Sequence, residues 1–420
     1  MSPREFAIQV AEKLQAAGFQ GLWAGGCVRD QLVGRVPQDY DVATDATPEQ
    51  VRELFGHRRT IPIGAAFGVI TVVGPKSAGQ IEVATFRRDM EYSDGRRPDS
   101  VEYTDAREDA LRRDFTINGI FLDPVQNEVI DYVEGRADID CRIVRAIGDP
   151  HERIREDKLR LLRGVRFAGT FGFELEPLTR AAVIQHAPEI GAVSAERIGG
   201  EMRRMLLHPN RADTLQLLAD CQLLREIVED GEQLYKNRAN WRTRLGWLQQ
   251  LGPVCQFEQA AAILLSPLLK FQGIQPTAER WKLSNAEQKT ILWIEKHGIT
   301  LSRSHLMPWS ELQPLLIHPD VAPTFQITKL QFGDHHPGVR ACQKKLAMPA
   351  ELLDPKPLVS GNDLIELGMR PGPAFSEILN RVRVAQLDGQ IETPQEGRQW
   401  VKSIQNEEYK EPCDDADGEG

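Results

Sequence analysis

The hydrophobic pattern of this chain changes near Asp149, and the change divides it into a mixed α/β part and a helical part. Before that residue, alternating β-branched runs at 67–73 and 80–86 are separated by the turn-forming segment 74–79 and predict a β-hairpin. After it, strand signals almost vanish and apolar residues recur at helical spacing. The helical segments are 156–171, 177–187, 194–207 and 211–221.

The length and charge of the chain limit its architecture and its partners. At roughly 150 residues per domain, 420 residues predict about three domains. A formal net charge of −10 argues against a protein coated in basic residues for non-specific nucleic-acid binding. A nucleic-acid substrate would therefore need a confined basic groove on an acidic body.

Neither a membrane span nor an exported, disulfide-linked protein is indicated. The longest apolar run, 260–269, is half of the ~20 residues that a span requires. The N-terminal segment contains acidic Glu5 and no apolar core of a signal peptide. Six scattered cysteines form no CxxC pair, which is typical of reduced thiols in a cytoplasm and excludes a CxxC zinc site.

The segment 25–44 (GGCVRDQLVGRVPQDYDVAT) contains candidate metal-binding and phosphate-binding residues. Asp39 and Asp41 are two apart in a predicted strand, so their carboxylates share one face and repel unless a divalent cation lies between them. Hard oxygen ligands of this kind suit Mg²⁺, although an isolated Asp-x-Asp is also typical of a solvated turn. Upstream, Gly25-Gly26 predicts a strand-to-helix turn open to a phosphate, with Arg29 in the first helical turn. A phosphate site beside a metal-binding pair indicates nucleotidyl transfer.

Three further motifs follow in order: 81–98 (IEVATFRRDMEYSDGRRP), 112–118 (RRDFTIN) and 156–167 (EDKLRLLRGVRF). Together with 25–44 they resemble the class II tRNA nucleotidyltransferase and bacterial poly(A) polymerase family, in the polymerase-β-like superfamily. The similarity extends over about residues 20–230 and weakens afterwards.

The resemblance implies an α/β nucleotidyltransferase head followed by all-α neck, body and tail domains. We expect a catalytic head at 1–145, a neck that binds nucleotide and RNA at 146–235, and a body and tail for tRNA at 236–405. Residues 406–420 are an acidic tail that we expect to be disordered. The implied site comprises Asp39 and Asp41 as catalytic metal ligands, and as nucleotide-binding residues Gly26, Arg29, Arg113, Asp157, Arg160, Arg163 and Arg166.

Asp157 and Arg160 fit the selection of cytosine and adenine. Both bases present an amino donor beside a ring-nitrogen acceptor, which a carboxylate and a guanidinium on one helix face would match. Without the motif, such a pair would be read as a salt bridge on a helix surface. Glu82 is a candidate third metal ligand or a structural carboxylate, and Asp114 is expected to be an ion-pair partner.

RNA binding is expected from two further segments. Together with the arginines of the nucleotide pocket, Arg197, Arg203 and Arg204 on the helix 194–207 are candidates for the start of a basic groove. The segment 235–247 interleaves basic and aromatic residues, which fits either RNA contact or tryptophans packed into the helical body.

The sequence therefore predicts an enzyme that adds CCA, or its terminal nucleotides, to tRNA 3′ ends from CTP and ATP with Mg²⁺. The alternatives are a poly(A) polymerase and an enzyme that adds only A. Addition of C alone is disfavoured because the loop motif DGRRP (94–98) is present, and a catalytically inactive tRNA-binding protein because the Asp pair is intact. The oligomeric state is not predicted.

Overall fold

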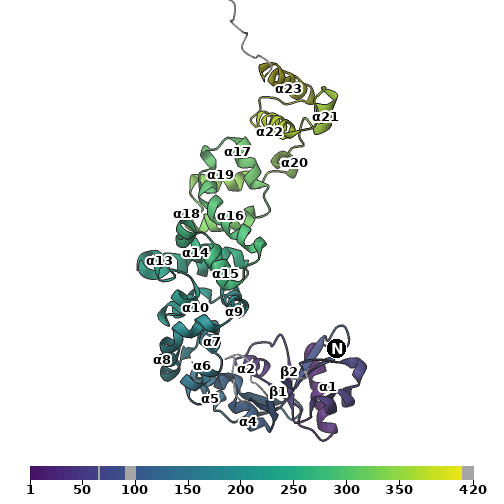
Figure 1. The fold of residues 1–420 in the computed structure, drawn as a ribbon, viewed down its shortest axis with the longest axis vertical. Helices are drawn as coiled ribbons and strands as arrows, with labels where there is room; N and C mark the ends of the chain where they lie inside the picture. The colour runs from purple at the N-terminus through teal and green to yellow at the C-terminus, as the bar shows by residue number, and fades with distance from the viewer. Residues whose placement is uncertain (65–66, 90–100, 409–420) are drawn as a thin grey trace, which may run out of the picture. The chain divides into compact units, whose positions relative to one another are not determined.

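The computed structural model describes residues 1–64, 67–89 and 101–408 (Figure 1). The chain forms two compact units: unit 1 comprises Met1–Phe257 with Lys270–Ser284, and unit 2 comprises Glu258–Leu269 with the residues from Asn285 onward. The loop 94–98 and residues 409–420 lie outside the described residues. Residues 406–408, which we expect to be part of a disordered tail, instead form the end of a helix, Pro394–Glu408. Within the described ranges, no helix is long and apolar enough to cross a membrane.

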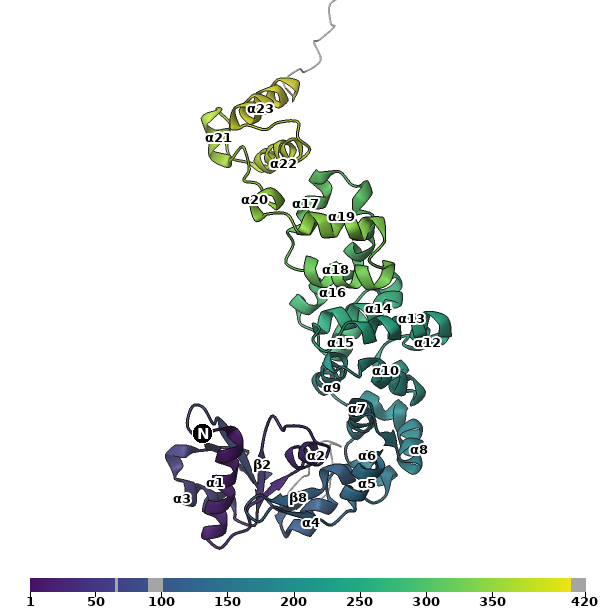
Figure 2. The same ribbon diagram turned by 180° about the vertical axis from the view of Figure 1, so that it is seen from behind.

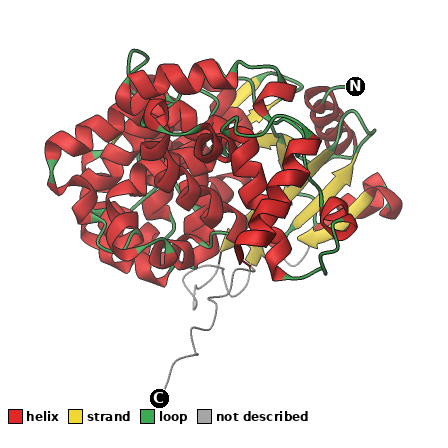
Figure 3. Cartoon of the chain, turned by 90° about the horizontal axis from the view of Figure 1, so that it is seen from above, coloured by secondary structure: helices red, strands yellow, loops and turns green. Residues whose placement is uncertain are grey.

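Unit 1 begins with a mixed seven-stranded sheet in the order β3-β4-β5-β2-β1-β8-β9. In Figure 3 the strands, drawn in yellow, gather in one region. The sheet strands are β1 (Leu22–Ala24), β2 (Asp41–Thr44), β3 (Thr60–Gly64), β4 (Val69–Val73), β5 (Gln80–Thr85), β8 (Ile120–Asp123) and β9 (Glu128–Asp131). A separate antiparallel pair is β6 (Arg87–Asp89) and β7 (Val101–Tyr103).

The predicted hairpin is confirmed and contributes two neighbouring strands. β4 and β5 pair antiparallel from Val73↔Gln80 to Val69↔Ala84, so their alternating apolar residues face one side. β5 also pairs with β2, and this pairing is parallel, with Asp41 opposite Glu82. β1 lies between β2 and β8 and is antiparallel to both, which places the β1–α2 turn beside the start of β2.

Short helices and an aromatic core fix the sheet. The helices of this part are α1 (Pro3–Ala16), α2 (Gly26–Leu32), α3 (Pro48–Phe55), α4 (Ala106–Leu111) and α5 (Gly135–Cys141). Capping boxes, in which the N-cap side chain and the third helical residue bond each other's backbone, begin α1 and α3. One core cluster joins strand residues with α4 residues such as Ala110 around the edge-to-face rings of Phe86 and Phe121.

From residue 146 the chain is helical, apart from the short strand β11 (Glu174–Leu175), which pairs with β10 (Ile143–Val144). The helices that complete unit 1 include α6 (Pro150–Glu156), α7 (Arg160–Phe171), α8 (Pro177–His186), α9 (Ala195–Leu207), α10 (Arg211–Asp220), α11 (Leu223–Ile227), α12 (Glu232–Lys236), α13 (Arg238–Gln250) and α15 (Gln275–Trp281). The segment 156–171 is not one helix, because three residues, Asp157, Lys158 and Leu159, separate α6 from α7.

Unit 2 is helical throughout its described residues. Its helices are α16 (Asn285–Ser302), α17 (Trp309–Leu316), α18 (Val321–Phe332), α19 (Pro337–Leu346), α20 (Ala350–Leu353), α21 (Gly361–Glu366), α22 (Pro373–Leu387) and α23 (Pro394–Glu408), while α14 (Phe257–Gln272) contains residues of both units. Two separate apolar clusters stabilise it: one joins α16, α17 and α19, and the other joins α21, α22 and α23.

Candidate active site

A pocket of about 660 Å³ opens in unit 1 where the sheet meets α7. Eight of its lining residues are arginines and three are aspartates, so its charge is strongly positive although the whole chain is acidic. We call this the arginine pocket. It is lined by Gly25, Gly26, Arg29, Asp41, Arg87, Arg112, Arg113, Asp114, Asn118, Asp157, Arg160, Arg163, Arg166, Phe167 and Arg204. All the predicted site residues except Asp39 therefore line one cavity.

The β1–α2 turn forms one wall of the pocket. Gly25 has φ +68°, in the region that favours glycine, and a Cβ atom there would lie 3.0 Å from Nη1 of Arg113. The guanidinium of Arg29 lies over the ring of Phe171 and donates to Asp30 and, at 2.7 Å, to Oδ1 of Asn118. These bonds use three of its five N–H donors, so two remain for a phosphate.

Acidic side chains gather where β2 begins. Asp41 is the first residue of β2 and lines the pocket, whereas Asp39 lies in the bend before the strand. The predicted strand therefore starts two residues later than Asp39. Glu82 is the register partner of Asp41 on the parallel strand β5, so the two side chains lie next to each other on one face.

The pKa of Asp41 reflects its burial and the nearby carboxylates. Surrounding protein atoms, which limit its hydration, raise the pKa of Asp41 to about 6; Glu82 and Asp39 add to this effect and Arg113 opposes it. Among the described residues, no cluster of three or more acidic, histidine or cysteine side chains forms a closed metal site. Mg²⁺ commonly binds through one or two carboxylates and takes its other oxygens from water and phosphates, so the donors present fit it.

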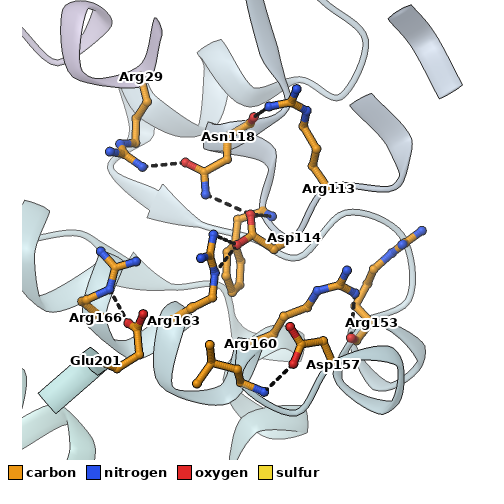
Figure 4. Close-up of polar contacts among 12 residues, drawn as sticks. Arg29, Arg113, Asp114, Asn118, Arg153, Asp157, Arg160, Arg163, Arg166 and Glu201 are labelled. Atoms are coloured by element: carbon orange, nitrogen blue, oxygen red, sulfur yellow. Dashed lines mark hydrogen bonds and ion pairs between the residues drawn. The ribbon is translucent and has the colours of Figure 1, made fainter. Parts of the chain in front are cut away.

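Asp114 and Asn118 connect the sheet to α7, as Figure 4 shows. Asp114 accepts from Nε of Arg163 at 2.7 Å and from Nδ2 of Asn118 at 2.9 Å. Burial disfavours its charged form, yet Arg163 and Asn118 outweigh this and lower the pKa of Asp114 to about 2. Asn118 also accepts from Arg29 and, through its backbone oxygen, from Arg113 at 3.2 Å. The expectation that Asp114 is an ion-pair partner agrees with these contacts, although the partner is Arg163 and not a flanking arginine.

A second buried carboxylate, Asp109, holds the arginines of the 112–118 motif. It is 2% exposed, and its two oxygens accept from Arg112 and Arg113 at 2.6–3.1 Å. Burial would raise the pKa of Asp109, but Arg113 and Arg112 reverse the effect and lower it. Neither Asp109 nor Asn118 is predicted from the sequence. Both lie within or beside the motif, and Asp109 also precedes Arg112 and Arg113 by three and four residues, a helical spacing that could have indicated the ion pairs.

Asp157 and Arg160 both line the pocket, but they are not neighbours on a continuous helix. Asp157 lies in the break after α6, and its carboxylate accepts two bonds from Arg197, at 3.0 and 2.7 Å. Arg160 is the first residue of α7 and pairs with Glu156. Their side chains are only 16% and 9% exposed. The predicted shared helix face is therefore wrong, and each side chain is held by a different partner.

The three α9 arginines that we expect at the start of an RNA groove have different surroundings, and the groove itself stays a prediction. Arg197 bonds Asp157, and Arg203 donates to the backbone oxygen of Trp281. Arg204 is 64% exposed on its side chain, pairs with the buried Glu201 and lines the arginine pocket. Arg166 pairs with the same Glu201, so α9 also supports the wall of the arginine pocket.

Known proteins resemble this chain over nearly its full length. The family described as "Poly A polymerase head domain" matches residues 22–145, and the family described as "Probable RNA and SrmB- binding site of polymerase A" matches residues 172–234. The CCA-adding enzyme of Geobacillus kaustophilus (strain HTA426) is 32% identical over 405 residues, which covers 94% of this chain and 95% of that protein. The CCA-adding enzyme of Streptococcus suis (strain 05ZYH33) is 30% identical over 417 residues, which covers 96% of this chain and 98% of that protein.

Solved structures give the same result. The Bacillus stearothermophilus CCA-adding enzyme in complex with CTP matches with a TM-score of 0.80 and 29% identity, over 97% of this chain and 99% of that one. The Thermotoga maritima CCA-adding enzyme complexed with tRNA matches with a TM-score of 0.66 and 19% identity, over 96% and 95%, which supports the fold alone.

Proposed function

The chain belongs to the family of CCA-adding enzymes, and from this membership we propose that it adds CCA to the 3′ end of tRNA from CTP and ATP without a nucleic-acid template. The observation that carries the proposal is the arginine pocket, in which a strongly positive wall faces the carboxylate of Asp41. Such a pocket suits a nucleoside triphosphate beside a metal-binding carboxylate.

The two kinds of charge in the pocket have different tasks. Asp39 and Asp41 would hold Mg²⁺, which when bound lowers the charge of the triphosphate and activates the attacking 3′ hydroxyl. The two free N–H donors of Arg29 bind phosphate oxygens, and Gly26 brings the backbone close without a side chain in the way. Arg113 is fixed by Asp109 and adds positive charge beside the turn. The proposed roles of Asp41, Gly26, Arg29 and Arg113 rest on this placement and on the family motifs. The role of Asp39, which does not line the pocket, rests on the motif and on its position two residues before Asp41.

Base selection uses Asp157 and Arg160, each held by its own partner. The Asp157 carboxylate accepts two bonds from Arg197 and one from the backbone N–H of Leu159, which leaves about one acceptor position, on Oδ2, for an exocyclic amino group. Arg160 offers its remaining N–H donors to a ring nitrogen. Uracil and guanine present the opposite pattern and would leave these nearly buried groups unpaired, which is the costly case. Arg163 and Arg166 complete the wall, held by Asp114 and Glu201.

The remaining assignments follow from the same proposal. We assign the head to 1–145, the neck to 146–235, and the body and tail to 236–405, with tRNA on the helical domains. The free cysteines Cys27, Cys141, Cys221, Cys255 and Cys342 fit a reducing compartment, so we place the protein in the cytoplasm.

Incorporation of radiolabelled CTP and ATP into tRNAs that end before CCA, after C and after CC tests the proposal. We expect two C additions followed by one A. Addition of A to the CC-ended tRNA alone would identify an A-adding enzyme, and long A tails on unrelated RNA would identify a poly(A) polymerase. In Asp41→Asn, incorporation of both nucleotides should be lost while the circular dichroism spectrum is retained, because the change removes a metal ligand and not a base contact. Near-normal turnover of this variant would show that the metal assignment is wrong.

A further inference from the structure

A second pocket, of about 440 Å³, lies among three helices of unit 1 and shares no lining residue with the arginine pocket. We call it the α13 pocket. α13 packs against both α10 and α12, and the three are labelled close together in Figure 2. Its lining residues are Gln216, Ala219, Asp220, Tyr235, Arg238, Trp241 and Arg242.

One wall of the α13 pocket is aromatic and fixed. Trp241 is 4% exposed, and its indole Nε1 donates to Oε1 of Gln216 at 2.8 Å. Tyr235 meets the Trp241 ring edge-to-face, with centroids 6.1 Å apart, and remains partly exposed. Trp241 is thus packed into the body, as one reading of the 235–247 segment predicts. The same packing leaves the Tyr235 ring held at the pocket, where a flat ligand can stack on it.

The α13 pocket is also lined by two arginines that have no partner among the described residues of the protein. Arg238 and Arg242 are four residues apart on α13, so they share one helix face, and both are exposed. Within the part of the chain that the structure describes, neither has a hydrogen bond or an ion pair. This differs from the arginine pocket, where Arg29, Arg163 and Arg166 are each bound to a protein acceptor. Guanidinium groups with all their donors available are suited to an external anion.

We propose that the α13 pocket binds one nucleotide unit of the tRNA substrate, away from the reacting 3′ end. This inference rests on the proposed function. The base would stack on Tyr235, the phosphodiester would lie between Arg238 and Arg242, and Asp220 would accept from the edge of the base. Two guanidinium charges against one carboxylate leave a net charge of +1, which matches one phosphodiester.

A free nucleoside triphosphate carries more negative charge than the net +1 of this pocket can neutralise. The charge balance therefore favours a nucleotide within RNA over a free nucleotide. In a chain with a formal net charge of −10, affinity for RNA must come from confined groups of basic residues, and Arg238 and Arg242 form one such group.

The test compares Arg242→Glu with Lys236→Glu. Both reverse one charge at exposed positions in the same stretch of chain, but Lys236 does not line the pocket. The measured quantity is the dissociation constant for labelled tRNA that ends before CCA, without nucleotides, together with the dissociation constant for ATP without RNA. We expect Arg242→Glu to weaken tRNA binding at least tenfold, Lys236→Glu to weaken it less than twofold, and ATP affinity to be equal in both.

Two results would overturn the inference. Equal tRNA losses in both variants would indicate a diffuse surface charge, and a loss of ATP affinity confined to Arg242→Glu would indicate a free-nucleotide site. Thermal melts guard against misfolding, and Arg242→Gln, which removes the charge without reversing it, should give a smaller loss in the same direction. Incorporation of CTP and ATP by Lys236→Glu reports separately on the proposed function, so the failure of either proposal is recognised on its own.

Discussion

Among single residues, Asp114 carries a buried charge that stabilises the junction between the sheet and α7. Its pKa falls from 3.8 to about 2 because Arg163 and Asn118 outweigh the cost of burial. A carboxyl whose pKa is lowered on folding adds stability above its unfolded pKa and loses it as the pH falls through the folded value. This contribution is therefore complete above about pH 4 and declines toward pH 2.

We expect Asp114→Asn to lower the free energy of unfolding at pH 7 by on the order of 2 kcal/mol, since one pKa unit corresponds to about 1.4 kcal/mol. The difference from the unaltered protein should shrink between pH 4 and pH 2. Urea unfolding at several pH values measures it, with the exposed Asp140→Asn as the control. A constant difference across that range would contradict the ionic role of Asp114.

Arg197 is a positioning residue whose effect on nucleotide choice can be measured. It donates two bonds to Asp157 but does not line the arginine pocket. Arg197→Met should free the carboxylate and lower the preference for CTP over UTP by about tenfold, which corresponds to about 1.4 kcal/mol. Competition between CTP and UTP in single-turnover incorporation gives the ratio, and Glu196→Gln, exposed on the same helix, is the control. An unchanged ratio would remove Arg197 from base selection.

The motifs identify which residues of this site carry charge, but not how the charges pair. RRDFTIN marks Arg113 and Asp114, yet the partner of Asp114 is Arg163, which is 49 positions further along the chain. Asp109 holds Arg112 and Arg113 through local i,i+3 and i,i+4 spacings. Arg29 reaches Asn118 from 89 positions away, and no local spacing encodes that contact. Sequence reasoning could therefore predict the charged residues of the site and not their long-range contacts.

At the scale of elements, the alternation of apolar and polar residues and the turn residues between the two runs predict the β4–β5 hairpin. This prediction succeeds because the register and the turn both depend on residues close together in the sequence. The segment 156–171 shows the opposite case. Its apolar spacing is helical, but Asp157 accepts from the backbone N–H of Leu159, which stabilises a break. The helical spacing of apolar residues is the same in one continuous helix and in two consecutive helices. For this reason the prediction that Asp157 and Arg160 share one helix face is wrong.

The β1–α2 turn depends on glycine in two ways that a matched pair of variants separates. Gly25 has φ +68° and lies against Arg113, whereas Gly34 has φ +76° and a Cβ atom there would meet nothing within 4 Å. Both alanine variants carry the strain of a positive φ, and it is the larger at Gly25, whose ψ of −122° lies outside the left-handed helical region. Only Gly25→Ala should also displace Arg113, and we expect it to raise the KM for both nucleotides about tenfold. Steady-state kinetics with tRNA in excess measure it, and equal effects in the two variants would contradict this prediction.

At the scale of the whole molecule, charge is distributed unevenly. The chain carries a formal net charge of −10, while eight arginines line one pocket. Most of these arginines are bound to acids such as Asp109, Asp114 and Glu201, which fix their positions and remove part of their charge. Local acid partners thus let basic residues be concentrated for a polyanionic ligand without giving the protein a basic surface.

This distribution predicts how binding depends on salt. Each phosphate neutralised by a basic side chain adds about 0.7 to 0.9 to the slope of log affinity against log salt, so a few contacts give a slope of only about 2 to 4. Arg204 is 64% exposed and lines the arginine pocket. Arg204→Gln should therefore lower the affinity for both tRNA and ATP, and should lower the slope of log tRNA affinity against log salt by just under 1. Binding titrations between about 50 and 300 mM KCl measure both quantities. A slope near 10, or a loss of tRNA affinity with ATP affinity intact, would show instead that a broad basic surface or a separate groove holds the RNA.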